Sequence, residues 1–279
     1  MSRPVDALIE FLESEQARGK SHVFLDDEAR EGMRELYIRA RKPIATPPSP
    51  AVEIASAPRP IAQTTKLIID GSDKAAKLES VKRQAASWAP AHALGSLRET
   101  LVFASGNVDA KIMMIGEAPG YHEEKDIQPF VGPAGQKLND ILKAMGISRD
   151  EIYISSLVKF RPAIPKQTTN NRKPNPEEIA SCLPLVLAEI DIVQPEIIIA
   201  LGGTAAEGLL NLSGSLESMR GTWHQISNIP VRVTYHPSYL LQSSSNQVKR
   251  LLWEDMLAVM EKLGMTISEK QRGFFLPKA

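Results

Sequence analysis

The stretch IMMIGEAPG at residues 112–120 decides the fold class of this chain. Its first four residues are apolar, which is typical of a buried strand in a parallel sheet. Two glycines and a proline then predict a tight turn at the point where the strand ends. In open α/β sheets, ligands bind outside the carboxyl ends of the strands. We therefore predict that Glu117 is a catalytic carboxylate at this strand end.

Around this stretch, from about residue 97 onward, apolar runs alternate with segments of helical periodicity. The expected strands are 111–116, 151–157, 196–201 and 230–235. The expected helices are 134–145, 176–193, 203–211 and 246–263. The third strand is apolar throughout and suits the centre of a sheet. The pattern predicts an α/β sandwich with a central parallel sheet flanked by helices.

The N-terminal third differs from this pattern. Residues 1–42 combine helical periodicity with many charges and predict a helical accessory segment. Residues 43–80 begin with a proline- and alanine-rich stretch, which is typical of a semi-rigid linker, and continue as a polar lead-in. Residues 81–279 then form the main domain. What the accessory segment binds stays open at this point.

Composition limits the remaining classes. Lys and Arg together number 33, as do Asp and Glu, so the formal net charge is zero. This balance excludes a bulk polycation but allows a local basic patch. The single cysteine, Cys182, excludes an intrachain disulfide and an all-cysteine metal site. No apolar run has membrane-spanning length and the N-terminus lacks a signal-peptide core, so we expect a cytoplasmic protein.

Three segments are expected at one edge of the sheet. They are GEAPG at 116–120, PFVGPAG at 129–135 and YHPS at 235–238. Together they offer a carboxylate, an aromatic face, an imidazole and a hydroxyl. They also offer backbone amides at helix starts, which favour anions such as phosphate.

Five motifs stand in the order and approximate spacing of the family 4 uracil-DNA glycosylases. Between about residues 98 and 264 they are GEAPG, PFVGPAG, YISSLVKFRP, ALG and TYHPSYLL. The chain therefore resembles this family. The resemblance implies the uracil-DNA glycosylase fold with a four-stranded parallel sheet. It also implies hydrolysis of the N-glycosidic bond of uracil, or of another deaminated base, in DNA during base excision repair. Such an enzyme must take the base out of the duplex.

The resemblance implies roles for single residues. Glu117 would position the attacking water and offset positive charge on the sugar. His236 would stabilise negative charge on the departing base. Phe130 would stack on the extruded base, and Gly116 and Ser156 would complete the base pocket.

The implied DNA contacts surround this pocket. Amides near three glycines, together with a serine, would bind phosphates, an apolar wedge would fill the vacated stack, and basic residues would approach the backbone. The amide and hydroxyl candidates are Gly120, Gly135, Gly202 and Ser238. The wedge candidates are Tyr239, Leu240 and Leu241. The basic candidates are Lys166, Arg172 and Lys173 in the loop 166–173, and Lys249 and Arg250.

The chain departs from the family at the metal positions. Family members usually hold a [4Fe–4S] cluster with four cysteines, and the corresponding positions here are Ala89, His92, Phe160 and Cys182. One thiolate cannot hold a cluster that needs four ligands. We therefore predict no cluster, no other cofactor and no metal.

The pocket departs as well. Ser156 replaces the asparagine that usually reads the uracil edge, and Ile127 replaces a glycine before the stacking residue. A hydroxyl offers a single adaptable group in place of the two-point pattern of an amide. An alternative function is therefore a catalytically weak or inactive DNA-binding member of the superfamily. A third is a hydrolase of free nucleosides on the same fold.

Overall fold

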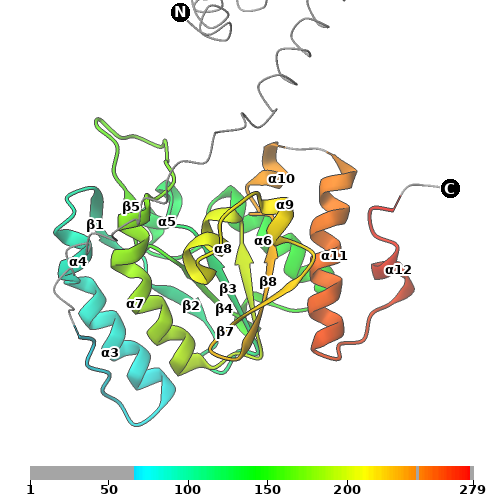
Figure 1. Ribbon diagram of the computed structural model, residues 1–279, viewed down its shortest axis with the longest axis horizontal. Coiled ribbons are helices and arrows are strands. Elements are labelled where there is room, and N and C mark those ends of the chain that lie inside the picture. Colours follow the sequence, from blue (N-terminus) through cyan, green and yellow to red (C-terminus); the bar gives the residue numbers. More distant parts are fainter. Residues whose placement is uncertain (1–65, 243–244, 277–279) are drawn as a thin grey trace, which may run out of the picture. The chain divides into compact units, whose positions relative to one another are not determined.

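A computed structural model describes residues 66–242 and 245–276 of the chain. Its centre is a six-stranded sheet with the order β2-β4-β3-β6-β8-β7 (Figure 1). The strands are β2 (Ala104–Gly106), β3 (Ile112–Gly116), β4 (Tyr153–Ser156), β6 (Ile197–Leu201), β7 (Trp223–Ile226) and β8 (Ile229–Thr234). Helices flank the sheet, which confirms the predicted α/β class.

The four central strands are parallel, and this confirms the expected four-stranded core. β4 pairs with β3, β3 with β6, and β6 with β8, each in parallel register. The edge strands β2 and β7 add antiparallel pairs. Because the carboxyl ends of parallel strands meet at one edge, the segments after Gly116, Ser156, Leu201 and Thr234 emerge together.

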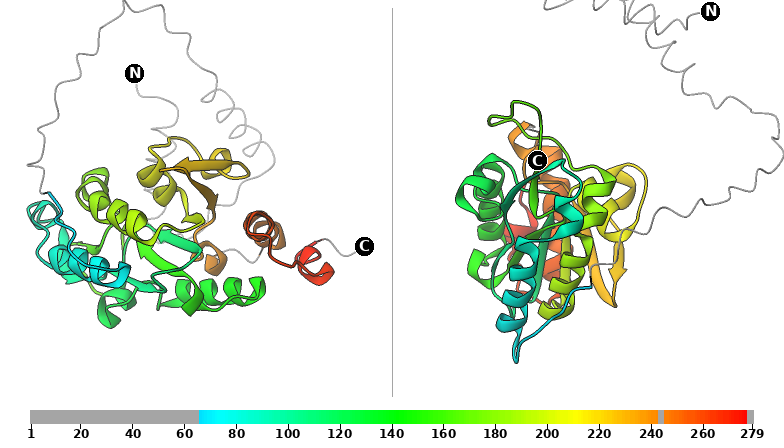
Figure 2. Two further views of the ribbon diagram at one scale, coloured as in Figure 1. Left: turned by 90° about the horizontal axis from the view of Figure 1, so that it is seen from below. Right: turned by 90° about the vertical axis from the view of Figure 1, so that its left-hand side faces the viewer.

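Successive residues of the parallel strands face two hydrophobic layers, as the twofold period of a strand requires. In β3, Met113 and Ile115 belong to a cluster with α3 (Lys74–Ala86), α7 (Pro176–Val193) and α8 (Gly203–Leu210). Ile112 and Met114 belong to the second cluster, with α6 (Pro133–Met145) and α11 (Asn246–Lys262). Figure 2 shows the two groups of helices on opposite faces of the sheet.

Shorter elements complete the fold. A second sheet pairs β1 (Leu97–Leu101) with β5 (Phe160–Pro162) in antiparallel register. The short helices are α4 (Ala89–His92), α5 (Tyr121–Asp126), the 3₁₀ turn η1 (Arg149–Glu151), α9 (Leu216–Met219), α10 (Tyr239–Gln242) and α12 (Glu269–Arg272). The four helices and four strands whose bounds the sequence predicted begin and end within two residues of those bounds, whereas the 13-residue helix α3 had no predicted bounds. The short elements had no sequence prediction.

A buried ion pair lies beside β4. Lys159 Nζ is 2.7 Å from Glu189 Oε1, and both side chains are fully buried. The Ser155 hydroxyl donates to Glu189 Oε2 at 2.5 Å. Burial raises the pKa of Glu189, against the opposing effect of Lys159. The pair therefore depends on both partners, because either charge alone would be buried without compensation.

The predicted accessory segment at 1–42, and most of the predicted linker and lead-in at 43–80, lie outside the described residues. The helix α3 begins at Lys74 and buries Leu78 in the core, so the boundary predicted at residue 81 falls inside this helix. The division of the chain stays a prediction. Among the described helices, none is long and apolar enough to cross a membrane.

Candidate active site

The turn after β3 is fixed to the neighbouring strand. The N–H of Leu157 donates to the carbonyl of Gly116 at 2.9 Å, and the N–H of Val158 donates to the carbonyl of Glu117 at 3.0 Å. These bonds continue the pairing of β3 with β4 beyond the last strand residue. The Glu117 backbone is therefore held at the carboxyl edge of the sheet, with its side chain half-buried.

A cavity of about 410 Å³ opens at this edge, and we call it the polar cavity. Its size falls within the range of small-molecule sites. It brings together eight of the predicted site residues, which are Glu117, Gly120, Phe130, Ser156, Arg172, Lys173, His236 and Ser238. The sequence prediction did not include its other lining residues, which are Ala118, Pro119, Glu123, Ala134, Asn171 and Gln242.

Phe130 has a strained backbone, with φ at 55°. Arg149 holds this conformation, because its guanidinium donates to the carbonyls of Pro129 and Phe130, the latter at 2.9 Å. The ring packs against Gly116, where a Cβ would lie 2.5 Å from Cζ. The Phe130 carbonyl packs against Gly135, where a Cβ would lie 1.8 Å from the oxygen. Gly116 and Gly135 are therefore needed to seat the aromatic ring, and neither lines the cavity.

His236 accepts a hydrogen bond at Nδ1. The backbone N–H of Ser238 donates to His236 Nδ1 at 3.2 Å, and Ser238 Oγ lies 2.7 Å from the same nitrogen. Because Nδ1 accepts a hydrogen bond, the neutral ring carries its proton on Nε2. Burial lowers the pKa of His236, and Lys173 also lowers it, against the raising effect of Glu117 and Glu123. Burial therefore favours the neutral form of the ring, which carries its proton on Nε2.

Glu123 connects the two loops of the site. One carboxylate oxygen accepts the N–H of Gly132 at 2.9 Å and that of Val131 at 3.1 Å. The other accepts the N–H of Gly120 at 3.2 Å. The predicted phosphate-binding amide at Gly120 is therefore already bonded within the protein. Glu123 is the third residue of α5 and Gly120 is its N-cap, and an acid at this capping-box spacing could have indicated the contact.

The basic loop divides into residues with different roles. Arg172 donates to the carbonyls of Ser96, Ala163 and Lys173 and to both carboxylate oxygens of Glu178. These bonds use all five N–H groups of a guanidinium, so none is left for a phosphate. Arg172 therefore holds the loop, whereas Lys173 lines the polar cavity as a cation. Lys166 is exposed and does not line the cavity.

Ser156 is 3% exposed and lies at the end of β4. Its Oγ would be 3.7 Å from a Cβ on Gly116, so Ser156 lines the polar cavity close to the end of β3. Within residues 66–242 and 245–276 its hydroxyl makes no hydrogen bond. Gly202 is buried at the end of β6, where a Cβ would lie 3.1 Å from the Cβ of His236. Gly202 therefore makes room for His236.

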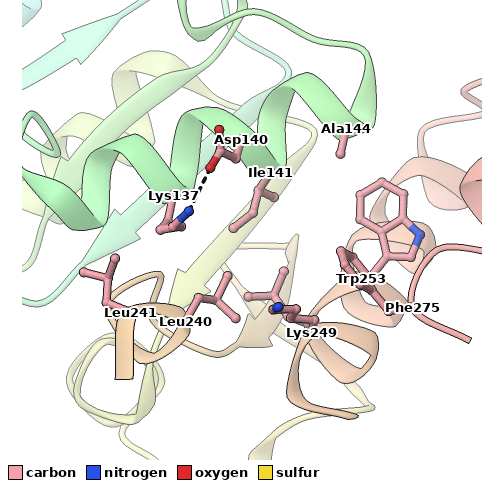
Figure 3. Close-up of a pocket in the computed structure, with 10 residues that line it drawn as sticks. Lys137, Asp140, Ile141, Ala144, Leu240, Leu241, Lys249, Trp253 and Phe275 are labelled. Atoms are coloured by element: carbon pink, nitrogen blue, oxygen red, sulfur yellow. Dashed lines mark hydrogen bonds and ion pairs between the residues drawn. The ribbon is translucent and has the colours of Figure 1, made fainter. Parts of the chain in front are cut away.

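A second cavity of about 360 Å³, the apolar groove, lies between α6, α10, α11 and the C-terminal segment. Figure 3 shows Leu240 and Leu241 across from Ile141 in this groove. Two of the predicted wedge residues thus line the groove and not the polar cavity. The third, Tyr239, is 44% exposed and stacks on Tyr235 with ring centroids 5.3 Å apart. Lys249 also lines the groove.

The positions that correspond to cluster cysteines do not fit a four-thiolate metal site. Phe160 and Cys182 are fully buried in one hydrophobic cluster. The ring of His92 packs edge-on against Phe160, with centroids 4.9 Å apart, and Ala89 is exposed. Burial raises the pKa of the Cys182 thiol and so opposes the thiolate. No group of potential metal ligands occurs in the described part of the chain.

Comparisons with known proteins agree with this geometry. A family model described as the uracil DNA glycosylase superfamily matches residues 103–257. The type-4 uracil-DNA glycosylase of Thermotoga maritima is 40% identical over 163 residues, which cover 57% of this chain and 81% of that protein. The type-4 enzyme of Sulfurisphaera tokodaii is 34% identical over 208 residues, 71% of this chain and 90% of that protein. A type-5 uracil-DNA glycosylase of Pyrobaculum aerophilum is 30% identical over 152 residues, which cover 48% of this chain and 64% of that protein.

Proposed function

Because the chain belongs to the uracil-DNA glycosylase superfamily, we propose that it hydrolyses the N-glycosidic bond of uracil in DNA. The polar cavity would receive the base after it leaves the base stack. One observation carries the proposal: Glu117, Phe130 and His236 line a single cavity of about 410 Å³. A carboxylate, an aromatic ring and a neutral imidazole donor are the groups that this hydrolysis requires.

In the proposed reaction, the bond between the sugar carbon C1′ and the base nitrogen breaks first. Negative charge then develops on a carbonyl oxygen of the base, and Nε2–H of His236 donates to that oxygen. One preorganised donor of this kind contributes about 2.7–4 kcal/mol to catalysis. Because the imidazole is neutral, it stabilises the charge by donating a hydrogen bond without giving up its proton.

Glu117 acts on the sugar side. Its carboxylate offsets the positive charge on the sugar ring and orients a water molecule toward C1′. The water oxygen bonds to C1′, and a water proton finally neutralises the departed base anion. The products are the free base and an abasic site, and no Schiff base with a lysine is needed. Phe130 would hold the base by stacking on its face, which is worth about 1–3 kcal/mol.

Contacts to the DNA backbone would come from Lys173 and Ser238 at the rim of the polar cavity. The segment of Tyr239, Leu240 and Leu241 would enter the vacated stack. A substrate of DNA also agrees with the cytoplasmic location expected from the sequence. No partner is proposed for the N-terminal accessory segment.

Ser156 sets the expected selectivity. Because serine is shorter than asparagine, a water can fill the space that remains. The serine hydroxyl can both donate and accept a hydrogen bond. We expect lower uracil activity than in an enzyme with asparagine at this position, and relaxed selectivity toward larger deaminated purines. The Ser156→Asn variant should excise uracil faster and prefer it more strongly over hypoxanthine.

The alternative, an inactive DNA-binding protein, is not favoured. The relatives at 34–40% identity are named as glycosylases, and Glu117, Phe130 and His236 are all present in one cavity. A hydrolase of free nucleosides has less support, because it needs neither a wedge nor a basic rim.

An abasic-site assay tests the proposal. The purified protein is incubated with single- and double-stranded oligonucleotides that contain uracil, hypoxanthine or xanthine, and abasic sites are then cleaved with alkali. We expect cleavage at uracil, and cleavage slower by roughly a hundredfold or more with the Glu117→Gln variant as the matched control. Wild-type protein that binds these oligonucleotides but releases no base would refute the proposed activity.

A further inference from the structure

Asn171 lines the polar cavity and is held by a buried arginine. Arg161 is 2% exposed, and its Nε donates to Asn171 Oδ1 at 2.9 Å. The arginine is itself fixed, since Nη1 donates to Glu124 at 2.9 Å. Its Nη2 donates to the carbonyls of Thr168 and Asn170 at 2.9 and 2.8 Å. The position of the Asn171 amide is therefore determined by a network outside the cavity.

This network also determines which end of the amide faces the cavity. A guanidinium only donates, so the atom that it contacts is the carbonyl oxygen of Asn171 and the other end is the NH₂ group. That nitrogen lies next to the turn after β3, where a Cβ on Gly120 would be 2.9 Å from it. No acceptor bonds to it within residues 66–242 and 245–276. The side chain thus presents hydrogen-bond donors and no acceptor to a ligand.

We propose that Asn171 donates a hydrogen bond to a carbonyl oxygen of the extruded base and so selects keto bases over amino bases. This inference rests on the proposed function. Uracil carries a carbonyl at the position where cytosine carries an amino group, and hypoxanthine differs from adenine in the same way. An amino group at this position is also a donor, so it could not accept a hydrogen bond from the NH₂ of Asn171, and both groups would be left unpaired. Ser156 cannot make this distinction, because its hydroxyl can accept as well as donate.

The Asn171→Asp substitution is the sharpest test. Aspartate has the same shape and keeps an acceptor for Arg161, but it replaces the cavity donor by an acceptor. We expect kcat/KM for uracil to fall roughly 5- to 150-fold, the usual effect of leaving one buried polar group unpaired. Inhibition by free uracil should weaken in parallel. The ratio of uracil to cytosine excision should fall, whereas affinity for an undamaged oligonucleotide should match the control.

The matched control is Asn170→Asp, which adds the same charge at the preceding residue. Among the described residues, the Asn170 side chain accepts only from the N–H of Thr168, at 3.0 Å, and it does not line the polar cavity. Equal losses in Asn171→Asp and Asn170→Asp would mean that charge alone matters and would overturn the inference. An equal loss of affinity for uracil-containing and undamaged DNA would assign Asn171 to a phosphate and would also overturn it.

Binding of free uracil, measured by calorimetry, separates this inference from the proposed function. A wild type that excises no base, but whose uracil binding is weakened by Asn171→Asp, would refute the proposed activity and support the inference. An active wild type whose uracil binding and selectivity are unchanged by Asn171→Asp and Asn171→Ala would refute the inference alone. A wild type that neither excises nor binds uracil would refute both.

Discussion

Replacing Gly116 with alanine tests how closely the end of β3 packs against the ring of Phe130. A Cβ at this position would lie 2.5 Å from Cζ and 2.8 Å from Cε2 of Phe130. Since carbon atoms pack best at about 3.5 Å or more, the ring would have to retreat by about 1 Å. The Phe130 backbone cannot follow, because Arg149 and Gly135 contact its carbonyl. The ring would therefore move into the polar cavity, where we propose that the base binds.

We expect Gly116→Ala to weaken base capture by about 1–3 kcal/mol, the contribution of one aromatic stack. This corresponds to a loss of roughly 5- to 150-fold in kcat/KM. Single-turnover excision from a single-stranded oligonucleotide with one uracil measures the loss, and a thermal melt of the same preparation measures stability. The double variant with Phe130→Leu, whose side chain is shorter, should relieve the clash without restoring the stack.

Gly146→Ala is the matched control. Gly146 caps the C-terminus of α6 with φ at 82°, and in the part of the chain that the structure describes no atom lies within 4 Å of the position that a Cβ would take. Alanine therefore adds backbone strain without a clash. It should lower the melting temperature and leave excision unchanged. If Gly116→Ala excises uracil at the wild-type rate, the ring yields without cost and the packing argument is wrong.

Four further outcomes are expected. Glu117→Gln and His236→Ala should each lower turnover roughly a hundredfold or more with little change in DNA affinity, and equal losses in both would indicate a structural role. Because burial holds the pKa of His236 below its usual 6.5, the acid limb of kcat/KM that depends on His236 should lie below pH 6.5, and a limb at higher pH would contradict the neutral donor. Lys159→Met should destabilise the protein by about 3–5 kcal/mol, because it leaves Glu189 buried and unpaired. This loss should shrink as the pH falls and Glu189 takes up a proton, as urea unfolding at pH 5 and 8 would measure. Lys159→Met with Glu189→Leu should recover most of the stability. Finally, the purified protein should be colourless, and stoichiometric iron by elemental analysis would overturn the predicted absence of a cluster.

Sequence patterns predicted the long elements well because each has its own period. The apolar run in β6 and the capped start of α7 at Asn175 can be read without knowledge of their neighbours. The edge strands β2 and β7 were missed because they are three and four residues long and half-exposed. Such strands form only because a neighbour already supplies hydrogen-bond partners, and the local sequence does not contain that information.

The same division holds at the site. That Glu117, Phe130 and His236 lie together could be predicted, because each lies in a short motif at a strand end or helix start. The roles of Glu123, Arg149 and Asn171 depend on side chains and carbonyls that only the folded chain brings into reach. Arg172, expected to contact DNA, instead donates every N–H to the protein, because Glu178 and three carbonyls surround it.

The sequence by itself therefore determined the α/β class, the four parallel strands and the edge of the sheet at which the polar cavity opens. The physical reason is that burial of apolar residues and the φ preferences of glycine and proline act locally along the chain. Only the tertiary structure decided which polar groups remain free to meet a ligand. Each donor and acceptor is bonded to whichever partner the packed elements bring within about 3 Å, and that choice is not local.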